Sequence, residues 1–219
     1  MTLYRSKIKR CFNNIKSSII KTPLEYNQRL SSKYRCNIYL KREDQQNVRS
    51  FKIRGALNKI NTLSENQLKN GIVCASAGNH AQGFAFCCNK LNISGEIFVP
   101  NNTPLQKINR IKYFGGNNIN INLGMDTFTE TLNLSLEYTK NTNKTFIHPF
   151  DDEDVIDGQA TIGYEIEKQC GEQGFTPDYI LTCVGGGGLI AGISNYFIGI
   201  SHGPIIYGVE PMEAASMHT

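Results

Sequence analysis

Short apolar runs alternate with longer amphipathic stretches through the middle of the chain. Four of the runs have the length and composition of buried strands, and they lie at residues 72–76, 96–100, 118–121 and 145–149. Between them, helical spacing of apolar residues begins near His80, Pro104 and Thr127. Because strands and helices alternate, the pattern predicts a parallel, doubly wound sheet of the α/β class, flanked by helices.

The amino-terminal stretch has a helical pattern of its own. Ile8, Phe12, Ile15 and Ile19 recur at helical spacing before Pro23, which indicates a first helix. A mitochondrial transit segment is the alternative. The stretch is rich in lysine and asparagine and holds only two arginines, which favours the helix.

Lys52 lies beside an aromatic ring, where a strand-like run gives way to a helical one. The unprotonated amine of a lysine condenses with an aldehyde, and partial desolvation makes that form available near neutral pH. Phe51 offers a flat apolar face on which a pyridine ring can stack. The pair suits covalent binding of pyridoxal phosphate, and a solvated lysine beside a core aromatic residue is the alternative.

Two further bends are rich in small residues. Ser76, Ala77 and Gly78 join a predicted strand to a helix, and backbone amides at such a bend can approach a carboxylate. The glycine run 185–188 lies between a predicted strand at 181–184 and a helical stretch that begins at residue 189. Its amides can converge on a phosphate, with help from the helix N-terminus, although a flexible turn or a nucleotide loop has the same composition.

Seven segments occur together in one order along the chain. They lie at residues 41–44, 50–56, 76–83, 148–152, 155–161, 185–192 and 208–211. In this combination the chain resembles the threonine dehydratases (threonine deaminases) of the fold type II pyridoxal-phosphate enzymes, from about Ile8 to its last residue. The resemblance implies two domains of parallel twisted sheets flanked by helices, with the cofactor between them. The large domain would consist of residues 1–70 and 149–219, and the small domain of residues 71–148.

The resemblance also implies roles for individual residues. Lys52 would hold the cofactor covalently and take the Cα proton of the substrate, while Phe51 would pack against the cofactor ring. Asn79 would hydrogen-bond the 3-hydroxyl of the cofactor. The cofactor phosphate would be bound by Gly185, Gly186, Gly187, Gly188 and Leu189. The substrate carboxylate would be bound by Ser76, Gly78, Asn79 and His80. For the side chain of His80, a structural role at a helix start is the alternative.

The implied reaction is β-elimination from L-threonine, and from L-serine as a side activity, to give a 2-oxo acid and ammonia. Related serine racemases carry a serine at the position of Ala77, and a methyl group cannot exchange a proton, which favours a one-base dehydratase. Some racemases bind a divalent cation through two acids, and this chain has Glu210 and Ser216 at those positions. We therefore expect no metal.

The length of the chain leads to a second hypothesis about its function. Enzymes of this family are considerably longer than 219 residues, so we expect a large domain that is incomplete at its carboxy-terminal side and lacks the partner of the pyridine nitrogen. The alternative function is then a catalytically impaired remnant that binds pyridoxal phosphate weakly or acts as an interaction module. Another fold type II lyase or synthase is a third hypothesis.

Composition excludes other classes. The chain is 40% hydrophobic and 19% charged, and no apolar run approaches the roughly 20 residues that span a membrane. A net charge of +4 without a basic, aromatic-interleaved stripe does not indicate a nucleic-acid partner. The seven cysteines contain no Cys-x-x-Cys pair, which favours reduced thiols. We expect a cytoplasmic homo-oligomer that binds small amino acids.

Overall fold

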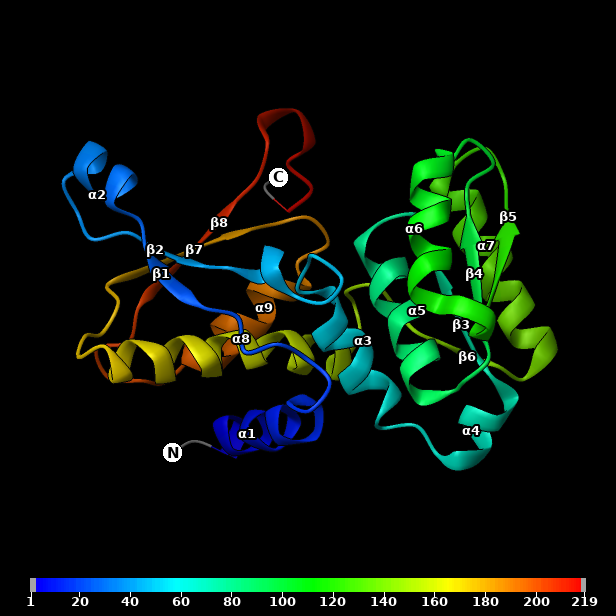
Figure 1. Cartoon of the computed structure of the whole chain (residues 1–219), viewed down its shortest axis with the longest axis horizontal. Coiled ribbons are helices and arrows are strands. Elements are labelled where there is room, and N and C mark those ends of the chain that lie inside the picture. Colours follow the sequence, from blue (N-terminus) through cyan, green and yellow to red (C-terminus); the bar gives the residue numbers. More distant parts are fainter. Residues whose placement is uncertain (1–2, 218–219) are drawn as a thin grey trace.

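The structure is a computed structural model that describes residues 3–217. The longest helix, α8 (Glu153–Glu172), packs against three other described helices, α1, α3 and α9. Figure 1 shows this helix and both chain ends on one side of the molecule and a four-stranded sheet on the other. The elements before that sheet are α1 (Leu3–Ile15), β1 (Leu24–Tyr26), α2 (Gln28–Tyr34), β2 (Tyr39–Lys41), the 3-10 helix η1 (Glu43–Gln45), α3 (Lys52–Ile60) and α4 (Glu65–Asn70).

The four-stranded sheet is parallel throughout, with strand order β5-β4-β3-β6. Its elements are β3 (Ile72–Ala75), α5 (Asn79–Leu91), β4 (Gly95–Val99), α6 (Leu105–Gly115), the 3-10 helix η2 (Gly116–Asn118), β5 (Ile119–Leu123), α7 (Phe128–Thr142) and β6 (Thr145–Phe146). Each predicted strand and helix of this region is present, so the predicted α/β class with a parallel sheet flanked by helices is confirmed.

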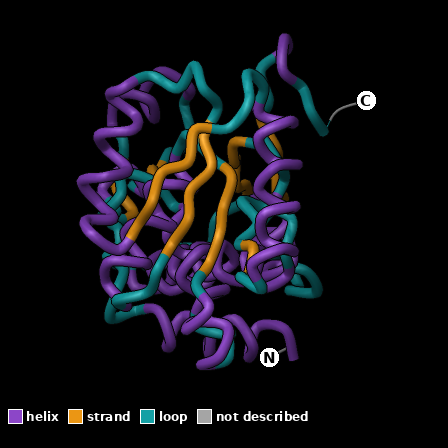
Figure 2. The backbone as a smooth tube through the Cα atoms, turned by 90° about the vertical axis from the view of Figure 1, so that its right-hand side faces the viewer, coloured by secondary structure: helices purple, strands orange, loops and turns teal. Residues whose placement is uncertain are grey.

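Both faces of the sheet are covered by helices, as Figure 2 shows. On β3, Ile72 and Cys74 pack into the core that α5 and α6 share, whereas Val73 and Ala75 pack against residues of α7. All four side chains are fully buried. A strand that is buried on both sides is apolar at every position, which is why the sequence shows continuous runs here instead of an alternating pattern.

The remaining elements follow α8 along the chain, and α9 packs against it. They are β7 (Tyr179–Cys183), α9 (Gly188–Phe197), β8 (Ile205–Val209) and the 3-10 helix η3 (Met212–Ala214). Strands β7 and β8 form a separate parallel pair, and β1 and β2 form an antiparallel pair that the sequence did not predict. Glycines let the helices approach closely: a Cβ atom at Gly158 would lie 2.5 Å from the Arg54 carbonyl oxygen on α3.

Two predicted boundaries differ from the structure. Strand β6 ends at Phe146 instead of residue 149, because the chain turns away from the sheet before Pro149, which has no N–H group for a sheet hydrogen bond. Helix α1 ends at Ile15, so Ile19 lies in the following loop, although its side chain still packs into the core. No helix within residues 3–217 is long and apolar enough to cross a membrane.

Candidate active site

Lys52 is the first residue of α3, and its amine lies in a largely apolar environment. The Nζ atom donates a hydrogen bond of 2.7 Å to the Pro149 carbonyl oxygen and lies 5.5 Å from the ring centre of Phe51 and 5.8 Å from that of Phe150. In the described part of the chain no carboxylate forms an ion pair with it. Burial therefore lowers the pKa of Lys52 below its usual value, since desolvation disfavours the ammonium form. The amine is suited to act as a nucleophile or base.

Close packing fixes the start of α3 against α5. A Cβ atom at Gly83 would lie 3.0 Å from the Ile53 nitrogen and 3.2 Å from the Lys52 carbonyl carbon. These contacts are with backbone atoms, which cannot move aside as a flexible side chain can. Gly83, in the segment that predicted the carboxylate loop, thus also sets the position of the lysine.

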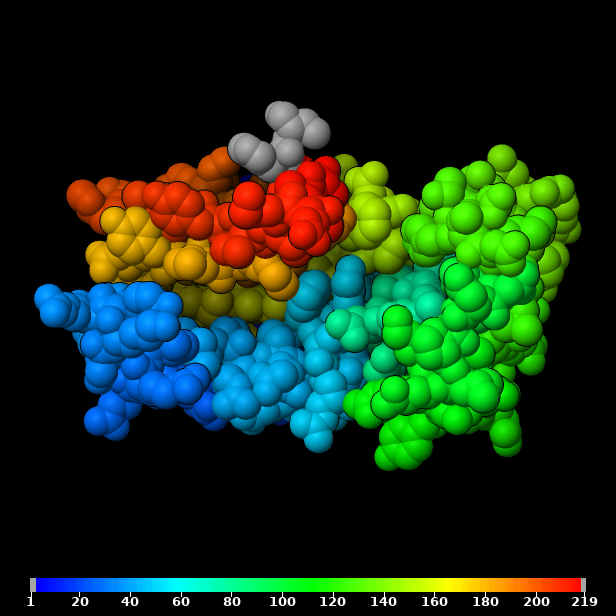
Figure 3. Space-filling model, turned by 90° about the horizontal axis from the view of Figure 1, so that it is seen from above, coloured from blue at the N-terminus to red at the C-terminus, as the bar shows by residue number. Residues whose placement is uncertain are grey.

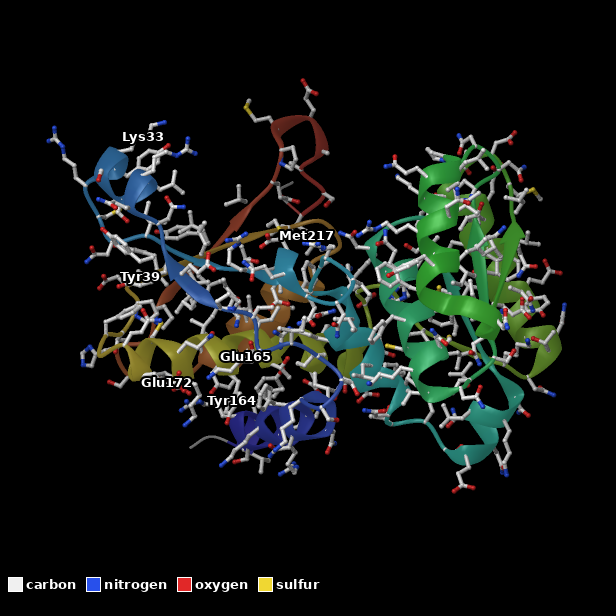
Figure 4. All side chains as sticks on the ribbon, in the orientation of Figure 1. Lys33, Tyr39, Tyr164, Glu165, Glu172 and Met217 are labelled. Carbon is white, nitrogen blue, oxygen red and sulfur yellow. The ribbon has the colours of Figure 1, made fainter. Side chains whose placement is uncertain are left out.

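A buried ionic network anchors the other side of α3. The fully buried Arg54 guanidinium binds both Glu165 carboxylate oxygens, at 2.8 and 3.0 Å, and both Glu43 oxygens, at 2.7 and 2.9 Å. Burial alone would lower the pKa of Arg54, but the two carboxylates raise it above its usual value. Lys41 binds Glu165 at 2.5 Å and Gln169 at 2.8 Å. Figure 4 labels Glu165 on α8. The network joins α3, α8, β2 and η1.

The predicted carboxylate loop connects β3 to α5. Ser76 and Gly78 are half-buried, and Asn79 is exposed as the first residue of α5. The Gly78 nitrogen donates to Ser76 Oγ at 3.2 Å. No side chain caps this helix in the described structure, and the first amides of a helix have no partner within it, so these N–H groups can bind an anion.

The side chain of His80 points into the protein. It is 3% exposed, and its Nε2 donates to the Ile147 carbonyl oxygen at 3.0 Å, while Nδ1 has no partner among the described residues. Burial and the Lys52 charge lower the pKa of His80 to about 3, so the ring is neutral. This geometry favours the structural alternative for the side chain, so only the backbone N–H of His80 remains able to bind an anion at the helix start.

The glycine run joins β7 to α9, and its last residue, Gly188, begins the helix. Gly187 has φ = 79°, in the left-handed region that favours glycine, and it precedes the first residue of α9. A Cβ atom at Gly186 would lie 2.3 Å from the Phe150 ring, and one at Gly188 would lie 2.7 Å from the Phe150 carbonyl oxygen. Larger residues are therefore excluded at positions 186 and 188, whereas Gly185 has open space beside it. Gly185 and Gly186 are exposed at the surface. Leu189 follows in the first turn of α9, half-buried.

The segment after β6 brings the lysine and the glycine turn together. Pro149 contacts Lys52 through its carbonyl oxygen, and the ring of Phe150 lies on Gly186. In the view of Figure 3, the red carboxy-terminal segment lies beside the yellow-green segment that follows β6. The Met217 side chain also approaches the turn: a Cβ atom at Gly187 would lie 3.0 Å from its Cε. Lys52 and the glycine turn therefore line one site.

The sequence did not assign the residues that support this site. Arg54, Glu43 and His148 lie in segments that carried the resemblance, but their partners are 11 to 111 residues away along the chain or are backbone groups. A charged residue beside the apolar positions of a helix, such as Arg54 next to Ile53 in α3, was the available signal, because a buried charge requires a partner. Nothing in the local pattern identifies that partner.

Within the described ranges no group of three or more histidine, cysteine or acidic residues could hold a metal ion. The Glu210 carboxylate instead accepts hydrogen bonds from Ser216 Oγ, at 3.2 Å, and from the Met217 nitrogen, at 2.9 Å. A hollow of about 630 Å³ lies elsewhere. Its lining includes Arg5, Tyr164 and Tyr196 and none of the predicted site residues.

The residues that meet at the site fit pyridoxal phosphate. The desolvated amine of Lys52 can react with an aldehyde, and the ring of Phe51 is adjacent to it. The glycine turn has no room for a side chain at residues 186 and 188, and its backbone is exposed at Gly185 and Gly186. Beside Phe51, the buried Ser50 Oγ lacks a hydrogen-bond partner in the described chain. A buried hydroxyl without a hydrogen-bond partner destabilises a protein unless a ligand supplies that partner.

Comparison with known proteins agrees with this chemistry. The chain is 48% identical over 209 residues to the protein named L-threonine dehydratase biosynthetic IlvA of Bacillus subtilis, an alignment that covers 95% of this chain and 49% of the relative. The chain thus spans about half the length of the curated relatives it matches.

Solved structures share the fold. Processed threonine deaminase isoform 2 from Solanum lycopersicum is 40% identical, with a TM-score of 0.85 over 97% of this chain and 58% of that protein. Maize serine racemase is 28% identical, with a TM-score of 0.88 over 96% of this chain and 62% of that protein. The model of the family described as "Pyridoxal-phosphate dependent enzyme" matches residues 15–219. The matched residues include Lys52, the loop between β3 and α5, and the glycine turn before α9. The chain therefore belongs to this family.

Proposed function

We propose that this protein is a pyridoxal-phosphate-dependent ammonia-lyase that dehydrates and deaminates L-threonine, and more slowly L-serine. The products from L-threonine would be 2-oxobutanoate and ammonia. The observation that carries the proposal is the Lys52 amine, which is desolvated, has no carboxylate partner in the described structure and lies beside the glycine turn. The similarity to an L-threonine dehydratase over almost the whole chain supports the substrate.

Each group at the site has a distinct task in this reaction. The cofactor, when bound, supplies an electron sink for the carbanion at Cα. Lys52 takes the Cα proton, because its lowered pKa makes the free amine available. The backbone amides of Gly78, Asn79 and His80, with Ser76 Oγ, hold the substrate carboxylate. The fixed carboxylate directs the Cα–H bond toward the lysine, which makes proton transfer effectively unimolecular.

The remaining assignments concern the cofactor. Its phosphate would be held by the backbone amides from Gly185 to Gly188 and by that of Leu189, at the start of α9. Phe51 would pack on the ring and Asn79 would hydrogen-bond the 3-hydroxyl. Asn79 is exposed, so its side-chain amide can reach a ligand.

Ala77 supports dehydration over racemisation. It packs with the core near α5 and presents only a methyl group, which cannot donate a proton to the second face of Cα. Restoring a hydroxyl there, as Ala77→Ser, tests this part of the proposal. Racemase activity in that variant together with its absence from the parent would support the assignment.

The domain division also belongs to this proposal. Residues 71–148 would form the small domain and residues 1–70 and 149–219 the large one, with residues 1–2 and 218–219 outside the described structure. Substrate would enter between the two. The enzyme would act in the cytoplasm, as a homo-oligomer.

One observation favours the alternative of an impaired remnant. Leu181 is 70% exposed and Tyr207 is 51% exposed on the paired strands β7 and β8. Parallel strands are ordinarily buried on both faces. A protein with this open face would bind the cofactor weakly or serve as an interaction module.

The deciding experiment mixes purified, monodisperse protein with pyridoxal phosphate, records the visible absorption, then adds L-threonine and measures 2-oxobutanoate. Borohydride reduction and peptide mass spectrometry identify the lysine that holds the cofactor. Lys52→Ala is the test variant, and Lys33→Ala, on the exposed surface, is the matched control. A Lys52 adduct with product supports the dehydratase. An adduct without product supports the remnant, and no adduct in folded protein refutes both cofactor assignments.

A further inference from the structure

One side-chain atom accepts two backbone hydrogen bonds within the turn between β6 and α8. His148 Nδ1 accepts hydrogen bonds from the Asp151 nitrogen, at 2.7 Å, and from the Phe150 nitrogen, at 3.3 Å. Acceptance from the second and third following amides is the pattern that asparagine and aspartate side chains use in Asx turns. The His148 ring therefore determines the path of the backbone from residue 148 to residue 151.

This path determines the surroundings of the lysine. It directs the Pro149 carbonyl oxygen to Lys52 Nζ, at 2.7 Å. It also sets the Phe150 ring on Gly186, with its centre 5.8 Å from the same Nζ. The His148 ring packs edge-on against the Phe150 ring, with centres 4.8 Å apart and an interplanar angle of 83°. One histidine thus supports both contacts that confine the amine.

His148 must be unprotonated at Nδ1 to accept these bonds. Burial lowers its pKa, and the positive charge of Lys52 acts in the same direction, whereas Asp151 and Asp152 oppose it. The other histidine nearby, His80, is itself neutral. The ring therefore keeps its acceptor at neutral pH.

We propose that His148 is a positioning residue that folds the 148–151 turn so that the Pro149 carbonyl and the Phe150 ring confine the Lys52 amine beside the glycine turn. The proposal rests on the proposed function only in that Lys52 is the cofactor lysine. The contacts join residues of the chain itself, so they can be tested apart from turnover.

Two variants distinguish the effect of losing the hydrogen-bond acceptor of His148 from the effect of losing the volume of its ring. His148→Leu removes the acceptor, and His148→Asn replaces it, since Oδ1 of asparagine can accept from the same two amides. The readout is the pH dependence of lysine acetylation by acetic anhydride, followed by peptide mass spectrometry. Lys33, which is exposed, serves as the reference lysine in the same sample.

In His148→Leu, water gains access to the amine, and the labelling midpoint of Lys52 rises toward that of Lys33. In His148→Asn it stays near the wild-type value. The yield of borohydride-trapped cofactor at Lys52, measured at subsaturating pyridoxal phosphate, falls about two- to tenfold in the leucine variant, as expected for loss of a hydrogen bond of ordinary strength. Recovery in the asparagine variant distinguishes the acceptor from general packing.

An unchanged Lys52 midpoint and adduct yield in folded His148→Leu would overturn the proposal, as would a change of the same size in His148→Asn. Amide hydrogen exchange of the wild-type peptide 148–152 tests the turn without any variant. Protected Phe150 and Asp151 amides support it, and exchange at the unprotected rate overturns it. If the cofactor assignment fails but the midpoint still shifts, the turn is supported and the proposed function is refuted.

Discussion

Replacing Arg54 by methionine should destabilise the protein strongly. Arg54 is fully buried and makes four hydrogen bonds to the carboxylates of Glu43 and Glu165, of which Glu165 is 1% exposed. Methionine fills much of the same volume but leaves Glu165 without the guanidinium. Removal of one partner from a buried ion pair costs about 3–5 kcal/mol. For a protein of this length that corresponds to a fall of about 6–20 °C in the melting temperature.

Arg42 provides the matched control. It also pairs with two acids, Glu25 at 2.6 Å and Asp44 at 2.8 Å, but it lies at the surface, where water replaces the lost partner. Arg42→Met should leave the unfolding midpoint nearly unchanged. Thermal and urea unfolding of both variants, monitored by circular dichroism, gives the comparison. Equal shifts of the unfolding midpoint in the two variants would refute the reasoning, because the two arginines are compared as differing in burial alone.

A second part of the test separates charge from packing. In the double variant Arg54→Met with Glu43→Gln, the Glu43 carboxylate that has lost the guanidinium becomes a neutral amide, whereas Glu165 keeps its contact with Lys41, so part of the lost stability should return. Arg54→Lys should fall between the parent and the methionine variant, because an ammonium cannot form the two-pronged contact with a carboxylate.

Three further predictions follow from the packing and the buried histidine. Gly158→Ala should lower the free energy of unfolding, measured in urea, by about 1–3 kcal/mol, because its Cβ would lie 2.5 Å from a backbone oxygen of α3. Gly171→Ala, which has open space on the same helix, should raise the free energy of unfolding by up to about 1 kcal/mol. Gly186→Ala should weaken cofactor retention in dialysis more than Gly185→Ala, since only the first Cβ collides with an aromatic ring. Burial lowers the pKa of His80 to about 3, so the unfolded chain binds the extra proton first, and stability should decline as the pH falls from about 6.5 toward 3. Urea midpoints across that range should show a smaller decline in His80→Asn, and an equal decline would contradict the assignment.

The local sequence pattern determined much of the secondary structure of this protein. Apolar runs at 72–76 and 96–100 predicted β3 and β4 because residues on both faces of a covered parallel strand are buried. The glycine run predicted a turn before a helix, and the structure has the turn because Gly187 adopts positive φ. Such features depend on neighbours in sequence, so a pattern of adjacent residues suffices to predict them.

Contacts between distant segments were decided only by the tertiary structure. Arg54 and Glu165 are 111 residues apart, and Lys52 and Pro149 are 97 residues apart, yet each pair is in hydrogen-bond contact. The sequence left two roles open for His80, and the fold turned its side chain inward to the Ile147 carbonyl. Periodicity shows which face of an element is buried but not which distant residue meets it. That choice depends on how all the elements pack at once, and here it set the environment of the lysine.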